Sequence, residues 1–537
     1  MKRTATAFLA LLLSSGACLL AQNPREGGAY DYNYIVCNSP WLTSSNAAGL
    51  PVNPAGKIAV AELSFGKRDG GLKGNEESPN SFEYGVQAES YYRLSDKIAF
   101  WGSLGYSGFR GQNMGGSILV NPDYNPVNFY ESDPANKGIV TRENYSVNGG
   151  ISYSFSPRWS IGAKVNYDAG NSTKRKDPRY RSTLMDMTLS LGGRFAPCEM
   201  FEVGLDFIYR KTTENILGKL YADTSIKYYT LVDYGGYWGK YELFEGDLGY
   251  VSLTNRRPML NNFYGGAAQL VFNWGKVRFF NELKYLYRTG YYGNKSESSV
   301  VFSSHNAHCI AYSGNLNISG ENASRHIVGL GFDMERLKNF ENSYKYETPS
   351  GESTIVKYLG ENQRLQRTLL HAQLSYTGYW GIEGNLPRWE GGAVADYNLK
   401  KTYATFYPDS RRQNISTVSA EAFARCNFTV GGSNILSGGV SIEGLGGWGV
   451  KNLDERTGSS TSATPKTSEE YLNIDFENRT LARLGEGLCF KYTRLFPSKG
   501  ISAYILLKDT FIHSVKNVEY MSGKYRNFAE IRIGCTF

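Results

Sequence analysis

Alternation of apolar and polar side chains with a period of two constrains this chain more than any other feature of its sequence. In residues 525–537 one face of a strand would carry five side chains: Ala529, Ile531, Ile533, Cys535 and Phe537. The opposite face would carry Glu530, Arg532, Gly534 and Thr536. Such a pattern is typical of a half-buried strand. A strand of about ten residues between lipid and water is the unit of a transmembrane β-barrel.

The same alternation recurs along the chain and predicts an all-β fold, a transmembrane antiparallel β-barrel of about eighteen strands. An even number returns both ends of the barrel to the periplasmic side. Boundaries read from alternation drift by about two to four residues, which leaves fourteen or sixteen strands as alternatives. The predicted strands are 58–66, 82–94, 97–109, 142–155, 158–170, 183–196, 199–212, 262–274, 277–290, 305–318, 324–335, 366–380, 391–405, 415–431, 435–449, 483–496, 501–513 and 525–537.

The connections between these strands are of two kinds, and they alternate. Tight turns such as Phe155–Trp159 and Trp274–Val277 carry an aromatic residue where the strand enters the turn. The longer connections are 110–141, 213–261, 336–365 and 450–470. Short periplasmic turns and long extracellular loops are typical of outer-membrane barrels. A soluble propeller would also alternate, but it would repeat about every forty residues, and the sequence shows no fixed period.

Hydropathy and charge exclude two other classes of protein. The mean hydropathy is -0.40, and no apolar run of about eighteen residues follows the leader, which argues against a helical membrane protein. The formal net charge is +8. Lys2 and Arg3 would leave with the leader, and the remaining charges alternate in sign. We therefore expect no nucleic-acid partner.

The first 56 residues divide into a leader and a segment without strand character. Residues 1–21 have the charged start and apolar core of a signal peptide. The alternative is a lipoprotein signal ending at Cys18, although Ser15 replaces its usual aliphatic residue. Residues 22–56 are rich in turn-forming residues and would form either a lumen plug or a disordered periplasmic lead-in. The barrel would cover residues 57–537.

Three resemblances support an outer-membrane location. The terminal Phe537 resembles the C-terminal signature by which the barrel assembly machinery recognises its substrates. Asn46–Leu50 resembles the Asn-Pro-Ala-Gly-Leu element of the fatty-acid-transporter class of outer-membrane barrels, with Ala47 in place of proline. The composition and the long aromatic loops resemble uncharacterised outer-membrane β-barrel proteins of Bacteroidota. These resemblances imply outer-membrane lipid and the assembly machinery as partners, and they bring no catalytic site.

Charged side chains on the polar strand faces must point into the lumen, because a lysine or arginine facing hydrocarbon at mid-depth costs about 2–4 kcal/mol. The candidate lumen-lining residues are Lys164, Asp206, Arg210, Arg278, Glu282, Arg288, Arg367, His371, Glu421, Arg425 and Arg532. They could form a selectivity lining or pair across neighbouring strands and brace the wall. Their mixed signs favour pairing.

The segment 213–261 is too aromatic to be disordered. Residues 225–233 and 237–244 around Gly235-Gly236 predict a hairpin that extends above the membrane. Aromatic side chains suit glycans, apolar ligands or partner proteins. The candidate loop-binding residues are Tyr229, Tyr234, Tyr237, Trp238 and Tyr241. Loop 450–470, rich in serine and threonine, is expected to be flexible.

Neither histidine nor cysteine points to a catalytic or metal site. His305 and His308 are three residues apart, so a strand would place them on opposite faces. His371 would be the best residue for a hydrolase, but its predicted face is luminal. Among the cysteines, only Cys37 and Cys198 could share the periplasmic side. We expect a protein that is not an enzyme and has no cofactor or metal.

The resulting functional hypothesis is a channel or transporter for a small solute. The alternative is a non-transporting surface receptor or scaffold that works with a partner transporter or secretion system. A partner protein would then bind at the extracellular or periplasmic face. An outer-membrane hydrolase ranks third.

Overall fold

The computed structural model describes residues 31–537 except 222–224, 245–248, 297–298, 351–352 and 460–463. The expected signal peptide, Cys18 and the start of the 22–56 segment lie outside these residues. None of the helices in the described ranges is long and apolar enough to cross a bilayer.

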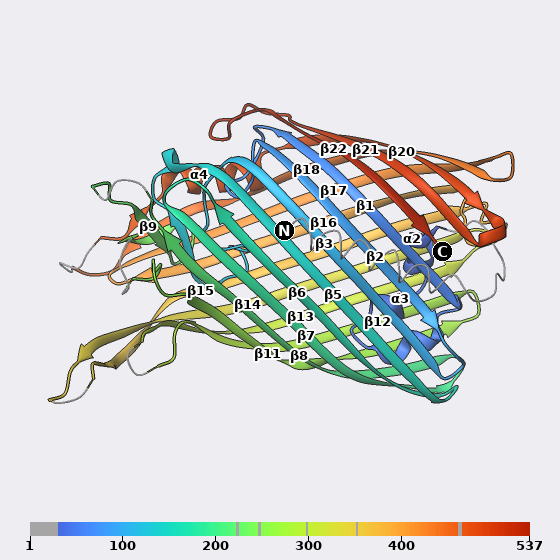
Figure 1. Cartoon of the computed structure of the whole chain (residues 1–537), viewed down its shortest axis with the longest axis horizontal. Coiled ribbons are helices and arrows are strands. Elements are labelled where there is room, and N and C mark those ends of the chain that lie inside the picture. Colours follow the sequence, from blue (N-terminus) through green and yellow to red (C-terminus); the bar gives the residue numbers. More distant parts are fainter. Residues whose placement is uncertain (1–30, 222–224, 245–248, 297–298, 351–352, 460–463) are drawn as a thin grey trace.

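Eighteen antiparallel strands form one closed barrel (Figure 1). Each strand pairs with its sequence neighbours in the wall, and β1 pairs with β22 to close it. The predicted fold class and strand number are confirmed. The wall strands are β1 (Lys57–Gly70), β2 (Asn80–Arg93), β3 (Ile98–Met114), β5 (Gly138–Ser156), β6 (Trp159–Lys174), β7 (Arg179–Cys198), β8 (Phe201–Lys219), β11 (Arg257–Trp274), β12 (Val277–Gly293), β13 (Val301–Ser319), β14 (Arg325–Glu347), β15 (Ile355–Trp380), β16 (Trp389–Phe406), β17 (Asp409–Val430), β18 (Asn434–Arg456), β20 (Arg483–Phe496), β21 (Ile501–Ser514) and β22 (Tyr525–Thr536).

The outward face of the wall is apolar. Leu191, Leu205 and Leu488 are each more than 60% exposed, although side chains of this kind are normally buried. On the same strands the intervening residues face the lumen, as the buried Glu202 and Asp206 do. A closed wall leaves no unpaired strand edge, and an apolar belt suits hydrocarbon. The protein is therefore an outer-membrane β-barrel.

The two rims differ as predicted, although the bounds of the long connections need correction. Short connections such as 157–158 and 275–276 join strands at the periplasmic rim. At the extracellular rim, residues 336–365 are not a long loop, because β14 and β15 continue through most of this range as a paired hairpin. Alternation of apolar and polar residues fades where both strand faces meet water, so the sequence pattern ends before the strands do.

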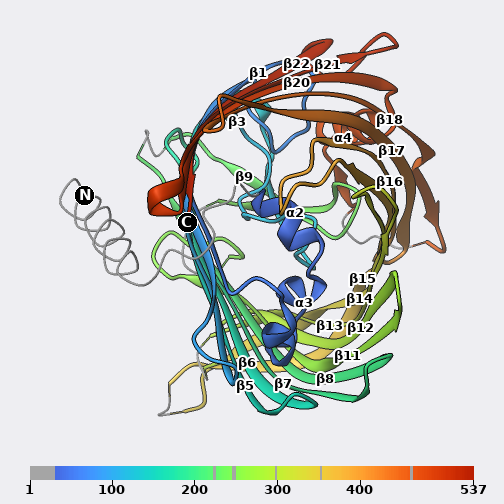
Figure 2. The same ribbon diagram turned by 90° about the vertical axis from the view of Figure 1, so that its right-hand side faces the viewer.

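Three short helices before β1 lie inside the barrel (Figure 2). They are α2 (Tyr32–Cys37), α3 (Pro40–Thr43) and η1 (Ala47–Val52). The Asp31 side chain accepts a hydrogen bond from the backbone nitrogen of Tyr34, and Asn46 caps η1 in the same way. We call residues 31–56 the N-terminal segment.

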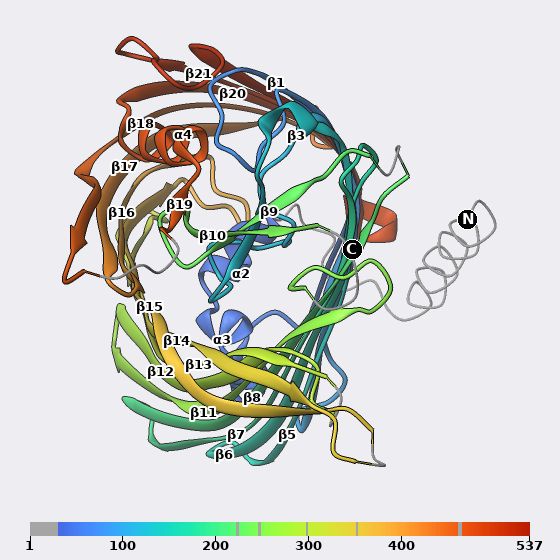
Figure 3. The same cartoon turned by 90° about the vertical axis from the view of Figure 1, so that its left-hand side faces the viewer.

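Segments from three extracellular connections cross the other mouth of the barrel (Figure 3). A second sheet contains β4 (Asn128–Glu131), β9 (Tyr229–Asp233), β10 (Trp238–Leu243) and β19 (Lys466–Thr467). The helix α4 (Glu469–Thr480) follows β19. Two short helices lie elsewhere: η2 (Pro134–Asn136) between β4 and β5, and η3 (Pro497–Lys499) between β20 and β21. We call the second sheet, α4 and their connecting loops the cap.

The predicted aromatic hairpin exists as β9 and β10, but it bends across the barrel mouth instead of extending away from the barrel. The hairpin tip folds into the barrel mouth, where Gly235 lies against Leu365 and Ala404 of the wall. Tyr234 and Trp238 belong to the buried cluster that also includes Phe129 and Phe244. Burial of large aromatic side chains is favourable, and it draws this hairpin inward.

The flexible loop expected over 450–470 is shorter than predicted, because strands occupy part of this range. Residues 450–456 belong to β18, and β19 pairs with β10. The centre of the loop, 460–463, lies outside the described residues.

The six cysteines of the described chain, Cys37 and Cys198 among them, are free thiols.

Candidate functional site

A chamber of about 960 Å³ lies in the lumen between the N-terminal segment and the cap. Ser44 and Ser45 of the N-terminal segment form its floor, and Asp123 and Tyr124 of the 115–127 loop form part of its roof. The charged wall residues around it are Lys164, Asp168, Asp186, Arg210, Lys284, Asp333, Glu335, His371 and Lys400, and Arg479 of α4 completes the roof.

The floor is anchored by Asn46, which is fully buried. Its side-chain nitrogen donates hydrogen bonds to the backbone carbonyls of Gly193 and Leu205, at 3.0 and 3.3 Å. The same nitrogen donates to Oε1 of Gln269 at 2.9 Å. The wall can approach this closely because residue 192 is glycine, where a Cβ would lie 2.3 Å from Oδ1 of Asn46.

Three of the predicted lumen residues also hold the floor. The Ser44 hydroxyl donates to Glu282, and Nζ of Lys164 donates to the Ser44 carbonyl at 2.8 Å. Asp206 accepts a hydrogen bond from Gln269 at 2.7 Å. Buried polar groups of this kind are costly unless they are paired, so the wall carboxylates and the N-terminal segment require one another.

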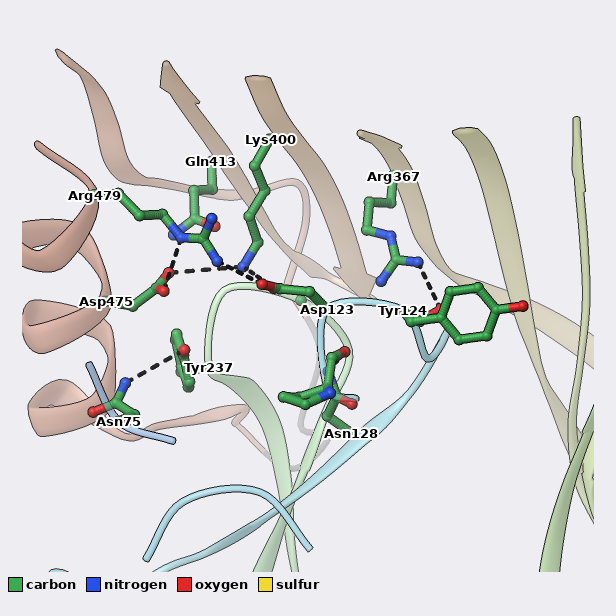
Figure 4. A network of polar contacts seen from close by, with 12 residues as sticks. Asn75, Asp123, Tyr124, Asn128, Tyr237, Arg367, Lys400, Gln413, Asp475 and Arg479 are labelled. Carbon is green, nitrogen blue, oxygen red and sulfur yellow. Dashed lines mark hydrogen bonds and ion pairs between the residues drawn. The ribbon is translucent and has the colours of Figure 1, made fainter. Parts of the chain in front are cut away.

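Two predicted arginines, Arg367 (Figure 4) and Arg288, hold the roof by its main chain. Nη2 of Arg367 lies 3.1 Å from the carbonyl oxygen of Tyr124, and Nη1 of Arg288 lies at the same distance. Glu335 accepts hydrogen bonds from both arginines, at 2.8 and 2.7 Å. One carboxylate thus bridges two guanidinium groups that hold the loop.

Asp123 ties the roof loop to the cap helix. Its carboxylate lies 3.1 Å from Nζ of Lys400 and 2.8 Å from Nη2 of Arg479. Asp475 accepts a hydrogen bond from Arg479 at 2.9 Å and lies 3.7 Å from Lys400. The attraction of Lys400 and Arg479 holds the pKa of Asp123 well below its usual range. This cluster joins the wall, the loop and α4 (Figure 4).

The side wall of the chamber carries paired charges of both signs. Arg210 and Asp186 on neighbouring strands form a bidentate pair, at 2.9 and 2.5 Å. Nε2 of His371 lies 2.9 Å from Asp396, and Nδ1 lies 3.8 Å from Asp333. The residues that the structure describes contain no group of three metal-ligating side chains. Because charged side chains of both signs line it, the chamber can offer a solute both hydrogen-bond donors and acceptors.

The remaining predicted lumen residues lie elsewhere. Glu421, Arg425 and Arg532 line a second cavity, of about 180 Å³, together with Asp31 of the N-terminal segment. Arg425 lies 3.4 Å from Glu390 on the adjacent strand. Arg532 is paired with Glu530 at 2.8 Å. Arg278 sits near the periplasmic rim at the start of β12.

The predicted loop-binding residues divide by exposure. Tyr234, Tyr237 and Trp238 are buried within the cap, whereas Tyr229 and Tyr241 are exposed. The aromatic side chains of the hairpin thus serve mainly to build the roof.

The backbone nitrogen of Phe537 donates a hydrogen bond to the carbonyl of Ala59 on β1.

His305 and His308 lie on opposite strand faces, as predicted. His305 is buried, and its Nε2 lies 2.6 Å from Oδ1 of Asn261. His308 faces outward, with Nδ1 2.8 Å from the hydroxyl of Tyr285.

Sequence reasoning missed the roof residues Asp123, Tyr124 and Arg479. Asp123 and Tyr124 lie in Asn121-Pro-Asp-Tyr-Asn-Pro126. Residues of this kind predict a turn, but they do not predict whether the loop points into the lumen or away from it. Arg479 lies on a helix that the expectation of long extracellular loops did not include. Lys400 is followed by Lys401, so charge alone does not say which of the two faces the lumen.

Comparison with known proteins gives a family and distant structural neighbours. The family described as "Family of unknown function (DUF6850)" matches residues 47–537. No curated protein matches the chain. The solved ferric preacinetobactin receptor BauA of Acinetobacter baumannii is 8% identical, with a TM-score of 0.36, over 89% of this chain and 80% of that chain. The outer-membrane transporter YddB of Escherichia coli is 8% identical, with a TM-score of 0.38, over 90% and 81%.

Proposed function

We propose that this chain, which belongs to the family of unknown function DUF6850, is a gated outer-membrane transporter for a small polar solute. The observation that carries the proposal is the chamber, which lies between two elements that are not part of the wall. The N-terminal segment supplies the floor, and the cap supplies the roof. An unregulated pore would need neither element.

The chamber has the size and chemistry of a solute site. Ligand pockets usually measure about 300–1,000 Å³, and the volume here is about 960 Å³. Lysine, arginine and carboxylate side chains line it in similar numbers, and Lys164 lies 4.5 Å from the ring of Trp101. A solute rich in hydroxyl groups, or one with both charges, fits this lining better than a strongly anionic or cationic one.

In this proposal the N-terminal segment acts as a plug and the cap as an outer gate. The first test is planar-bilayer conductance of the refolded mature chain, a version without residues 22–56, an Asp123→Asn variant, and the combination. Loss of the floor alone leaves the roof in place, so the combination should give the largest open steps. The variant Lys97→Gln, in an exposed periplasmic turn, is the control.

Two outcomes would contradict the gated transporter. If the intact chain already conducts as well as the combination, neither element is a gate. If all versions are silent, while heat-modifiable migration shows that each barrel has folded, the chain does not conduct.

Silence would favour the alternative, a surface receptor or scaffold that works with a partner transporter or secretion system. The exposed Tyr229 and Tyr241 of the cap would then be the residues to test for a partner protein at the extracellular face. Neither proposal assigns the chain a chemical reaction.

A further inference from the structure

The outward face of β14 and β16 carries three basic side chains just above the apolar belt: Arg336, Lys338 and Lys401. Arg336 and Lys338 share the face of Leu330, which is 45% exposed, whereas the intervening Leu337 is buried towards the lumen. Side chains two residues apart on a strand lie on one face. All three residues are exposed. We call them the outer basic patch.

The strand register brings these three cations close together. Arg336 pairs with Thr368 of β15, and Thr368 pairs with Lys401 of β16. Neighbouring strands lie about 4.8 Å apart, so roughly 10 Å separates the two backbone positions. Lys338 stands two residues, or roughly 7 Å, further along β14. One phosphorylated group could therefore reach more than one of them.

Among the residues that the structure describes, no acidic side chain is paired with the patch. Its outward-facing register neighbours are His308, Asn306, Thr368, Gln366, Tyr403 and Asn414. Arg412, beyond Tyr403, is 3.5 Å from Glu455. Within the described ranges Glu361, which faces outward on β15, pairs with Asn342 further up the hairpin. Like charges held this close without a partner are unfavourable, which points to an anion from outside the chain.

The height of the patch matches the outer surface of the bilayer. Trp389, which pairs with Trp380 at the periplasmic rim, begins β16, and Lys401 follows twelve residues later. Twelve residues in a strand tilted by about 40° rise roughly 30 Å, about one hydrocarbon thickness. The outward residues directly beneath the patch are Met334, Leu370 and Leu399. Acyl chains would contact these side chains.

We propose that the outer basic patch binds the phosphorylated headgroup of a lipid in the outer leaflet. Arginine and lysine form strong charge-assisted hydrogen bonds with phosphate oxygens. A basic residue near an anionic membrane surface strengthens binding roughly fivefold. The site lies on the outside of the wall, separate from the chamber, so it is independent of the transport proposal.

The test uses the full chain in phosphatidylcholine nanodiscs that contain a small fraction of phosphatidic acid, with native mass spectrometry to count the phosphatidic acid retained. The variant Arg336→Gln/Lys338→Gln/Lys401→Gln is compared with Lys97→Gln/Arg158→Gln/Lys276→Gln. The second variant loses the same charge from exposed turns at the periplasmic rim. Heat-modifiable migration confirms that both have folded.

We expect retention to fall roughly fivefold for each cation removed from the patch and to stay unchanged in the control. Equal retention by the patch variant and the intact chain would overturn the proposal. An equal fall in both variants would overturn it too, because binding would then follow net charge alone. Complete displacement by inorganic phosphate would point to a soluble anion instead of a lipid.

Discussion

Nη1 of Arg367 on β15 lies 2.9 Å from the backbone carbonyl oxygen of Asn125 in the roof loop. A side chain of the wall thus holds an extracellular loop by its main chain, in the interior of the barrel. The contact does not depend on which side chains the loop carries. The wall therefore fixes the position of the roof loop.

Replacement of Arg367 should therefore loosen the roof. In Arg367→Gln the carbonyl groups of Tyr124 and Asn125 lose a donor, and leaving a buried acceptor unpaired costs about 1–3 kcal/mol. We expect faster protease cleavage within 115–127 on the folded barrel. Arg158→Gln, which removes an equal charge from an exposed turn, is the control. Cleavage at the same rate in both variants would contradict the assigned role.

Asn46 should matter for the floor in the same way. Asn46→Ala removes three hydrogen bonds to the wall and the cap of η1. We expect the N-terminal segment to become more accessible to protease while the barrel stays intact. Asn33→Ala, at an exposed position of α2, should leave cleavage unchanged. If both variants behave alike, Asn46 does not anchor the segment.

Gly49 offers a purely steric test of the same segment. A Cβ at this position would lie 2.1 Å from the ring of Trp41, whereas a Cβ at Gly56 would meet nothing within 4 Å. Gly49→Ala should destabilise the packed segment by about 1–3 kcal/mol, and Gly56→Ala should not. Hydrogen exchange of residues 31–56 measures the difference. Unchanged protection in Gly49→Ala would mean that Trp41 moves aside without cost.

Glu341, above the membrane-spanning part of β14, should make the cap sensitive to acid. Lys240 and Arg364 lie 3.1 and 2.7 Å from its oxygens, and the hydroxyl groups of Tyr234 and Tyr250 donate to it. Burial alone would raise the pKa of Glu341, but these groups outweigh burial and lower the pKa from 4.5 to about 2.

Because this pKa is lower in the folded protein, the contacts of Glu341 stabilise the cap above about pH 4.5. That contribution, about 3 kcal/mol, is lost as the pH falls towards 2. Hydrogen exchange of β9 and β10 should accelerate over this range in the intact chain. In Glu341→Gln exchange should be faster at neutral pH and should change less with acid. The same acid response in both proteins would exclude Glu341 as its source.

The wall could be predicted from sequence because lipid and lumen impose opposite chemistry on alternate residues. The predicted strand 277–290 corresponds to β12, Val277–Gly293, with the same start. Above the membrane this constraint ends, and the prediction of β14 stops twelve residues before Glu347. Strand number and order follow from a local pattern, but strand length beyond the bilayer does not.

The chamber could not be predicted because its floor and roof come from contacts between distant segments. Trp238 pairs with Thr467, and Asp123 meets Arg479. No local periodicity records such pairings. The luminal charges were visible as a set, yet the partners of Glu282 and Arg367 belong to the N-terminal segment and the roof loop. Alternation shows which way a strand residue points and says nothing of what enters the lumen to meet it.

The pairing of β1 with β22 sets an order of events during assembly. Residues 476 positions apart, Val60 and Thr536, must meet before the wall is complete. Contacts of such separation form late, because a very long loop has to close first. Until then the barrel has an open seam along its whole height. The N-terminal segment adjoins β1 at this seam, so it can settle sideways into the lumen and be enclosed when the seam shuts.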